Sequence, residues 1–189
     1  MSLQTWQETL MSATAAGSSF GSFTTAKTVL PTGCLVTLPA NWFYVGRMIR
    51  YTVWGGIGTL VTTPGTITLQ LNLGSVAAFS SGAVQLNATA HTNLPFRAEC
   101  VATCRAVGAT TTANLMGQWT LNGVMFTKTA LQTDQVNIGD SILAPATAMA
   151  VGTGFDSTAA QTLDFFAGFS INNAANTIQI QQVLVEALN

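Results

Sequence analysis

Apolar and polar residues alternate strictly along residues 66–73 (TITLQLNL). An apolar side chain at every second position turns one face of a β-strand toward a core and the other toward solvent. The same period of two runs through residues 47–54, and we expect the glycine pair at 55–56 to end that strand. Alternation continues for longer over residues 96–107, where Arg97 and Glu99 are neighbours on one face. These segments predict half-buried strands.

Shorter segments rich in β-branched and aromatic residues, bounded by Gly, Pro or Asn, predict further strands. They cover residues 23–29, 35–38, 76–80, 114–121, 124–129, 162–171 and 177–188. An Asn-rich loop joins the last two, and its residues suit turn positions. So many short strands with no helix between them predict an all-β fold, an antiparallel β-sandwich of jelly-roll type that forms one domain over residues 22–189.

The first 21 residues follow a different period. Leu3, Trp6, Leu10 and Met11 recur at helical spacing, which predicts a short helix with one apolar face, and residues 15–21 have the composition of a flexible linker. Two interpretations stay open for this segment of residues 1–21. The helix folds back onto its own domain, or it is an arm whose four apolar residues bind a neighbouring subunit.

Charged residues make up only 7% of the chain, and 48% of the residues are hydrophobic. An average soluble domain has about 25% charged residues. The surface must therefore consist largely of Thr, Ser, Asn, Gln and Ala. Moving these side chains out of water costs less free energy than moving charged groups does. This composition predicts extensive contact with other protein, including copies of the same chain.

The charge pattern also argues against several classes of partner. The net charge is −1 and the six Lys and Arg residues are scattered singly, so no basic stripe predicts direct binding to nucleic acid. Apolar stretches are too short for a helix that spans a membrane, and the N-terminus lacks the pattern of a secretory signal. We expect assembly in a cytoplasm.

The residue types that carry chemistry are few. Cys34, Cys100 and Cys104 are expected to be buried small apolar residues, and His91 lies in a polar stretch expected to be a loop. Asp134 and Asp140 flank a polar segment that fits a calcium loop poorly. The sequence thus predicts no catalytic residue, no metal and no cofactor, and we expect a protein that is not an enzyme.

Aromatic residues allow a second kind of function. The run from Trp42 to Tyr44 follows a turn signal and is typical of a core corner, although it also suits stacking on a sugar. Trp54, Trp119 and the segment around His91 are further candidates for carbohydrate binding.

Five segments resemble small virion proteins encoded by tailed bacteriophages. They are residues 35–43 (LVTLPANWF), 46–50 (GRMIR), 86–96 (LNATAHTNLPF), 103–108 (TCRAVG) and 151–156 (VGTGFD), and the likeness runs from about Phe23 to the C-terminus. The resemblance implies a structural role in the virion. It transfers no functional residue, because these segments are signatures of turns and strands.

Phage jelly rolls of this size include head decoration, or cement, proteins, which are often trimers on the shell, and modules of tails and fibres. The expected function is a homotrimeric capsid decoration protein that binds the major capsid protein or other virion proteins and stabilises the head. The alternative is a receptor-binding module of the tail or fibre that recognises a host surface glycan.

Overall fold

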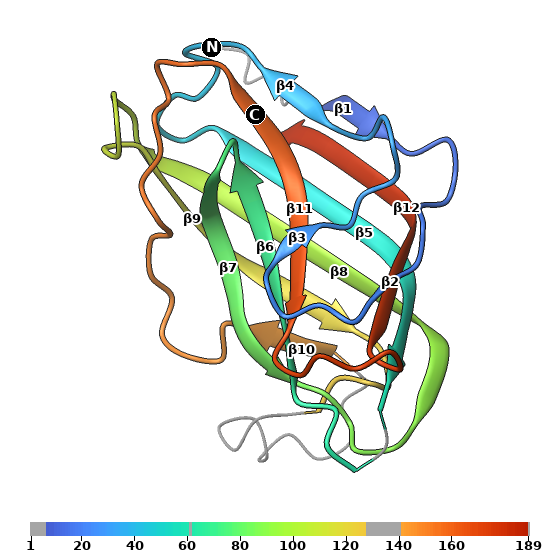
Figure 1. Ribbon diagram of the computed structural model, residues 1–189. Helices are drawn as coiled ribbons and strands as arrows, with labels where there is room; N and C mark the ends of the chain where they lie inside the picture. The colour runs from blue at the N-terminus through green and yellow to red at the C-terminus, as the bar shows by residue number, and fades with distance from the viewer. Residues whose placement is uncertain (1–6, 61, 128–140, 189) are drawn as a thin grey trace.

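The computed structural model describes residues 7–60, 62–127 and 141–188, and all its elements in this part of the chain are β-strands in two antiparallel sheets packed face to face (Figure 1). Sheet A is formed by β1 (Gln7–Ser12), β12 (Thr177–Leu188), β5 (Met48–Thr59), β8 (His91–Ala106), β9 (Asn114–Asn122) and β10 (Ser141–Ala144), in that order, with β2 (Phe20–Gly21) beside β12. Sheet B is formed by β3 (Lys27–Thr28), β11 (Gln161–Phe169), β6 (Thr66–Leu73) and β7 (Val76–Gln85), with β4 (Val36–Leu38) also on β11.

The strand order is that of a jelly roll. Sheet A contains β2, β12, β5 and β8 in sequence, and sheet B contains β3, β11, β6 and β7. The chain therefore crosses between the sheets in the order that two interlocked Greek keys require. Strands β9 and β10 extend sheet A beyond β8. The predicted fold class, an all-β antiparallel sandwich, is confirmed.

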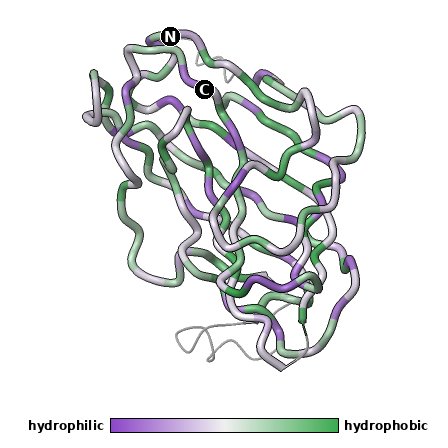
Figure 2. The backbone as a smooth tube through the Cα atoms, in the orientation of Figure 1, coloured by the Kyte–Doolittle hydropathy of each residue, from purple (hydrophilic) through white to green (hydrophobic). Residues whose placement is uncertain are grey.

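The core lies between the two sheets and is built from the inward-facing half of each alternating strand. In β9 the exposure alternates residue by residue, and Figure 2 shows hydrophobic and hydrophilic residues interleaved along the strands. Three aromatic side chains meet at its centre. The ring of Phe165 lies 6.0 Å from that of Tyr51 and 5.7 Å from that of Trp119, and all three are fully buried. Burying one such side chain stabilises the fold by about 1.5–3 kcal/mol.

The expected N-terminal helix is wrong for residues 7–12, which form strand β1. β1 pairs with β12 along its length, and these sheet hydrogen bonds outweigh the weak preference of an isolated short helix. The register shifts between Thr9 and Met11. This bulge explains the misleading spacing, because it lets two consecutive apolar residues, Leu10 and Met11, both pack against the core.

Gly55 and Gly56 do not end β5, which continues to Thr59. A Cβ atom on Gly55 would lie 2.1 Å from the carbonyl oxygen of Gln179, and one on Gly56 would lie 1.8 Å from the side-chain oxygen of Asn93. The glycines are therefore needed because neighbouring strands approach β5 closely. In this sequence the pair marks crowding within a sheet, not a turn.

Two further expectations were wrong in detail. A strand was expected at 124–129, but residues 124–127 form a turn with a single bridge from Phe126 to Leu86. The loop expected around His91 ends earlier, because His91 begins β8. Strand β10 was not anticipated. In the described part of the chain no helix could cross a membrane.

Candidate functional site

The outer face of sheet A carries the side chains that suit binding, and its centre is Trp54. Tyr51 and Val53 of β5 point into the core and are fully buried, so the alternation turns Trp54 outward, where it is partly exposed. The register sets Gln182 of β12 on one side of Trp54 and Arg97 of β8 on the other.

Asn122 of β9 lies opposite Arg97 and completes a row of four residues, which we call the Trp54 row: Gln182, Trp54, Arg97 and Asn122. Adjacent strands lie about 4.8 Å apart, so the row spans about 14 Å across the sheet. Such a row can follow an extended ligand that lies across the strands.

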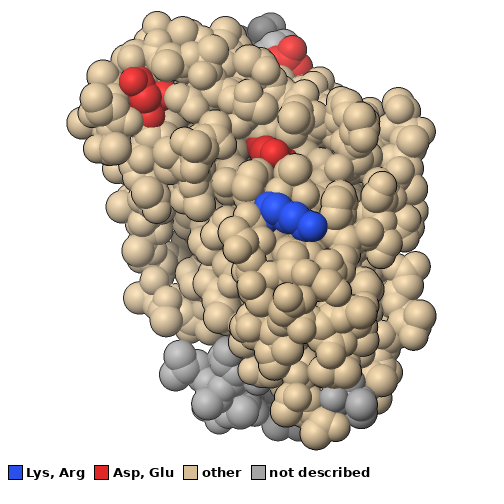
Figure 3. All heavy atoms as spheres, viewed as in Figure 1, with Lys and Arg blue, Asp and Glu red and all other residues tan. Residues whose placement is uncertain are grey.

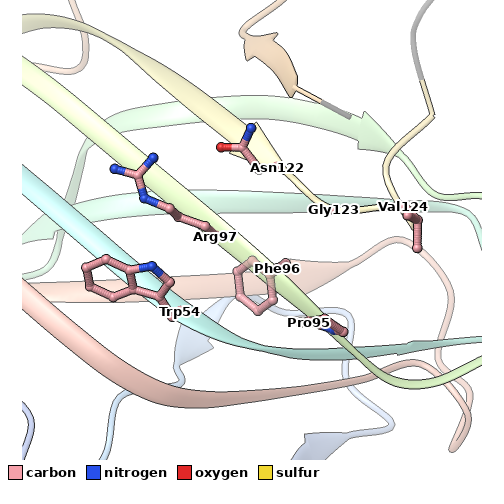
Figure 4. A pocket seen from close by; sticks show the side chains of 7 residues that line it. All are labelled: Trp54, Pro95, Phe96, Arg97, Asn122, Gly123 and Val124. Carbon is pink, nitrogen blue, oxygen red and sulfur yellow. The ribbon is translucent and has the colours of Figure 1, made fainter. Parts of the chain in front are cut away.

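An open hollow of about 390 Å³ lies beside this row. Trp54, Arg97 and Asn122 line it from three adjacent strands (Figure 4), and the exposed Val124 lines it as well. Phe96 also lines the hollow but is held in the core, where its ring packs edge-on against Phe126. The hollow therefore combines apolar walls with a few polar groups, as ligand sites usually do.

An ion pair forms the polar part of the site. Nη2 of Arg97 donates to Oε2 of Glu99 over 2.5 Å, and the hydroxyl of Thr52 reaches the same oxygen at 3.4 Å. The guanidinium carbon of Arg97 lies 5.9 Å from the centre of the Trp54 ring. The contacts between β5 and β8 thus hold a charged pair beside an aromatic ring.

A second ion pair lies on the same face, nearer to the start of β5. Nη1 of Arg50 is 3.2 Å from Oε2 of Glu186, and Nε2 of Gln7 donates to the other oxygen of that carboxylate. Both ion pairs found among the described residues are therefore on the outer face of sheet A. Each pair has no net charge.

A bulge in β12 shapes the edge of the site. The pairing of β12 with β5 shifts between Ile180 and Gln182, which leaves Gln181 without a partner on β5, and Gln181 and Gln182 are both exposed. If β12 kept a strict alternation from the buried Ile180 onward, Gln182 would point toward the core. The bulge therefore places an amide beside Trp54.

The other aromatic candidates fall outside this face. Trp119 is fully buried and cannot meet a ligand. Phe43 is buried as the core-corner interpretation expects, but Tyr44 is exposed, and Arg47 lies between the rings of Tyr44 and Trp42 at 5.2 and 3.8 Å. This group lies beyond the start of β5, about 20 Å along the strand from Trp54.

The predicted arm residues are only partly described. Leu10 and Met11 pack against their own core from β1, and Leu3 and Trp6 lie outside the described residues. A role for these four residues in binding a partner stays a prediction.

Residues that could carry metal or thiol chemistry give no site in the described part of the chain. No group of three His, Cys, Asp or Glu residues there could hold a metal ion, and Asp134 and Asp140 lie outside it. Cys34, Cys100 and Cys104 are free and buried, as expected, and burial raises the pKa of each thiol. A raised pKa keeps a thiol protonated and unreactive.

The sequence revealed only half of this site. The alternation marked Arg97 and Glu99 as neighbours on one face, and Trp54 was a candidate. Asn122 and Gln182 were missed, because they reach the site through the pairing of β9 with β8 and of β12 with β5, and that register is not visible in one strand alone. The bulge that exposes Gln182 leaves no clear signal in the sequence.

No family model and no curated protein matches this chain. Among solved structures, one match is the CBM2 module of the evolved Dit of Lactobacillus casei BL23 phage J-1, at 13% sequence identity and a TM-score of 0.40. The match covers 99% of this chain and 98% of that one. Identity and score at this level support no conclusion about a ligand or a partner.

Proposed function

We propose that this chain is a carbohydrate-binding module of a phage particle and recognises a glycan on the host surface. One observation carries the proposal: a partly exposed Trp54 in an open hollow, beside the Arg97–Glu99 ion pair and the amide of Asn122. The electron-rich face of an indole attracts the polarised C–H groups of a sugar ring. The neighbouring groups supply the hydrogen-bond donors and acceptors that sugar hydroxyls need.

The same geometry favours binding without catalysis. Glycoside hydrolysis ordinarily uses two carboxyl groups on either side of the scissile bond. Among the residues that the structure describes, Glu99 is the carboxylate nearest to the hollow along the sheet, and it is held by Arg97 and Thr52. We therefore propose a receptor-binding role and no enzymatic activity.

The phage assignment has two supports, namely the resemblance of five segments to small phage virion proteins and the low content of charged residues. We propose that the protein is assembled into the virion in the host cytoplasm, where it contacts copies of itself and other virion proteins. Several copies on one particle would raise the apparent affinity for a surface glycan well above that of a single site.

The test is binding of the purified protein to isolated bacterial surface polysaccharides, with Trp54→Ala and a matched control, Tyr44→Ala. Tyr44 is an exposed aromatic residue distant from the hollow. We expect Trp54→Ala to weaken binding at least about tenfold, as the loss of an aromatic anchor does, and Tyr44→Ala to leave it unchanged. Equal binding by the wild type and Trp54→Ala would show that the proposal is wrong.

A second candidate is the capsid decoration protein, in its expected form a homotrimer. It is favoured by the outer face of sheet B, which Figure 3 shows with few charged side chains and which other protein could therefore cover at low electrostatic cost. A decoration protein binds purified phage heads and ignores host cells, whereas a receptor-binding module does the reverse. Binding measured side by side on heads and on cells separates the two.

The arm hypothesis needs a smaller deletion than the whole segment 1–21. Residues 7–12 and 20–21 are strands of sheet A, so their removal would expose the edge of β12. Deletion of residues 1–6 removes Leu3 and Trp6 and spares both strands. Unchanged occupancy on heads after this deletion would rule out docking by those two residues.

A further inference from the structure

The Arg97–Glu99 pair has hydrogen-bonding groups left over. Of the guanidinium nitrogens of Arg97, Nη2 donates to Glu99. Oε2 of Glu99 accepts from both Arg97 and Thr52, and its Oε1 has no hydrogen-bond partner among the described residues. Arg97 and Glu99 keep 41% and 23% of their side-chain surface exposed. A ligand therefore meets spare donors and a spare acceptor side by side.

Two neighbouring hydroxyls of a sugar ring match this arrangement. Each hydroxyl can donate one hydrogen bond and accept others. One hydroxyl can donate to Oε1 of Glu99 while both accept from the guanidinium of Arg97. Hydrogen bonds to charged partners are about twice as strong as those between neutral groups, so this pair contributes to orientation as well as affinity.

The aromatic ring lies at a suitable distance from the polar pair. The guanidinium carbon of Arg97 is 5.9 Å from the centre of the Trp54 ring, and the two residues are direct cross-strand partners. A single pyranose can rest its C–H face on the indole while its hydroxyls reach the ion pair. Sites of this kind use the ring for affinity and the polar groups for orientation.

The charges of the site disfavour an acidic sugar. Glu99 already neutralises Arg97, and the other ion pair on this face, Arg50 with Glu186, is balanced as well. No unpaired cation of the Trp54 row is left to receive a carboxylate. A uronate bound beside Glu99 would face a like charge across a partly dehydrated contact, which is unfavourable.

We propose that the hollow beside Trp54 takes an uncharged pyranose through two neighbouring hydroxyls held by Arg97 and Glu99, and that it discriminates against the corresponding uronate. This inference rests on the proposed carbohydrate-binding function and names the class of sugar. The discrimination arises from the carboxylate of Glu99, so it should disappear when that charge is removed.

The test compares matched oligosaccharides that differ only at C6: glucose with glucuronate, galactose with galacturonate, and mannose with mannuronate. For the pair that binds best, we expect the wild type to prefer the neutral sugar at least about tenfold. In Glu99→Gln the amide keeps the shape and can still accept from Thr52, but Arg97 becomes an uncompensated cation. The preference should fall to about twofold or less, or reverse.

A second measurement uses only the wild-type protein, in case Glu99→Gln fails to fold. Because an uncharged sugar forms no ion pair with the site, its affinity should change less than about twofold between low and high salt. A wild type that prefers uronates, or whose binding is lost at high salt, overturns the inference and leaves the proposed function standing. If none of the sugars shows binding that is lost in Trp54→Ala, the proposed function fails and the inference fails with it.

Discussion

The outer faces of the two sheets follow the same alternation of side chains but carry different chemistry. On sheet A, the face presents Trp54 and both ion pairs found among the described residues. On sheet B, the corresponding face presents mainly uncharged hydroxyl and amide side chains, with a depression of about 250 Å³ lined by residues such as Thr66, Thr68 and Gln70. Its carboxylate, Asp164, is hydrogen-bonded by the hydroxyl of Thr28.

This difference changes what the low charge content means. The composition predicts a surface suited to protein contact everywhere, but four of the thirteen charged residues of the chain are paired on one face. The Arg97–Glu99 pair, which lies beside the aromatic hollow, favours recognition of a polar ligand there. The outer face of sheet B, which carries few charged side chains, keeps the properties that suit contact with other virion proteins. The two proposed roles can therefore be separated by face.

The largest expected effect concerns the close packing of strands beneath the Trp54 row. Gly55→Ala would bring a Cβ atom to 2.1 Å from the carbonyl oxygen of Gln179, so β5 and β12 must separate. We expect a loss of about 2–4 kcal/mol in the free energy of unfolding, measured by denaturant titration. Glycan binding should weaken in the same variant, because the strands that carry Trp54 and Gln182 move apart.

The matched control is Gly168→Ala on sheet B. There the new Cβ atom would lie 3.1 Å from Ala26, a tight contact that a small shift of β3 and its flank relieves. We expect a loss of less than about 1 kcal/mol and unchanged glycan binding. If the two alanine variants were equally stable, the close approach of β12 to Gly55 would not be a determinant of sheet A.

A smaller effect is expected from the second ion pair of sheet A. Glu186→Gln keeps a hydrogen-bond acceptor for Gln7 but leaves Arg50 without a counter-charge. The Arg50 side chain keeps 36% of its surface exposed, so water compensates in part, and we expect a loss of about 1 kcal/mol in the free energy of unfolding. The loss should shrink at high salt. A loss that does not depend on salt would mean that Glu186 stabilises through its hydrogen bonds to Gln7 and Arg50, not through its charge.

The fold could be predicted from the sequence to a large extent, because alternation directly encodes which residues face a core. The strand at 66–73 and the Arg97–Glu99 pair were identified in this way. Gly55 and Gly56 were misread as a stop because the approach of Gln179 depends on a strand more than 120 residues away in the sequence. Leu10 and Met11 were misread as helical because a bulge in a strand also brings consecutive apolar residues to one side.

The candidate site was harder to predict than the fold. A site on a sheet face combines residues from several strands, and their relative register is not visible in one strand alone. Trp54 and Trp119 were equal candidates in the sequence, yet only Trp54 lies on an outer face. The pairing of β5 with β8 and β12, and of β8 with β9, decided which aromatic residue met polar partners.

The smallest expected effect concerns Asp164, and its sign is opposite to that at Glu186. No ion pair of Asp164 is found among the described residues, and burial raises the pKa of its carboxyl, although hydrogen bonds from Thr28 and from the amide of Phe165 partly oppose this. The folded protein then holds the proton more tightly than the unfolded chain does. Stability is therefore lost as the pH rises from the ordinary pKa of an aspartate through the raised one.

Asp164→Asn removes this titration and can still accept both hydrogen bonds through its amide oxygen. As the pH rises over that range, Asp164→Asn should become more stable relative to the wild type, as measured by the unfolding free energy. At higher pH this difference should level off. Denaturant titrations of both proteins from acidic to neutral pH give this difference, and the other carboxyl groups cancel because they are common to both. A difference that falls with rising pH would mean that hydrogen bonding at Asp164 outweighs its burial, and that this carboxylate stabilises sheet B as Glu186 stabilises sheet A.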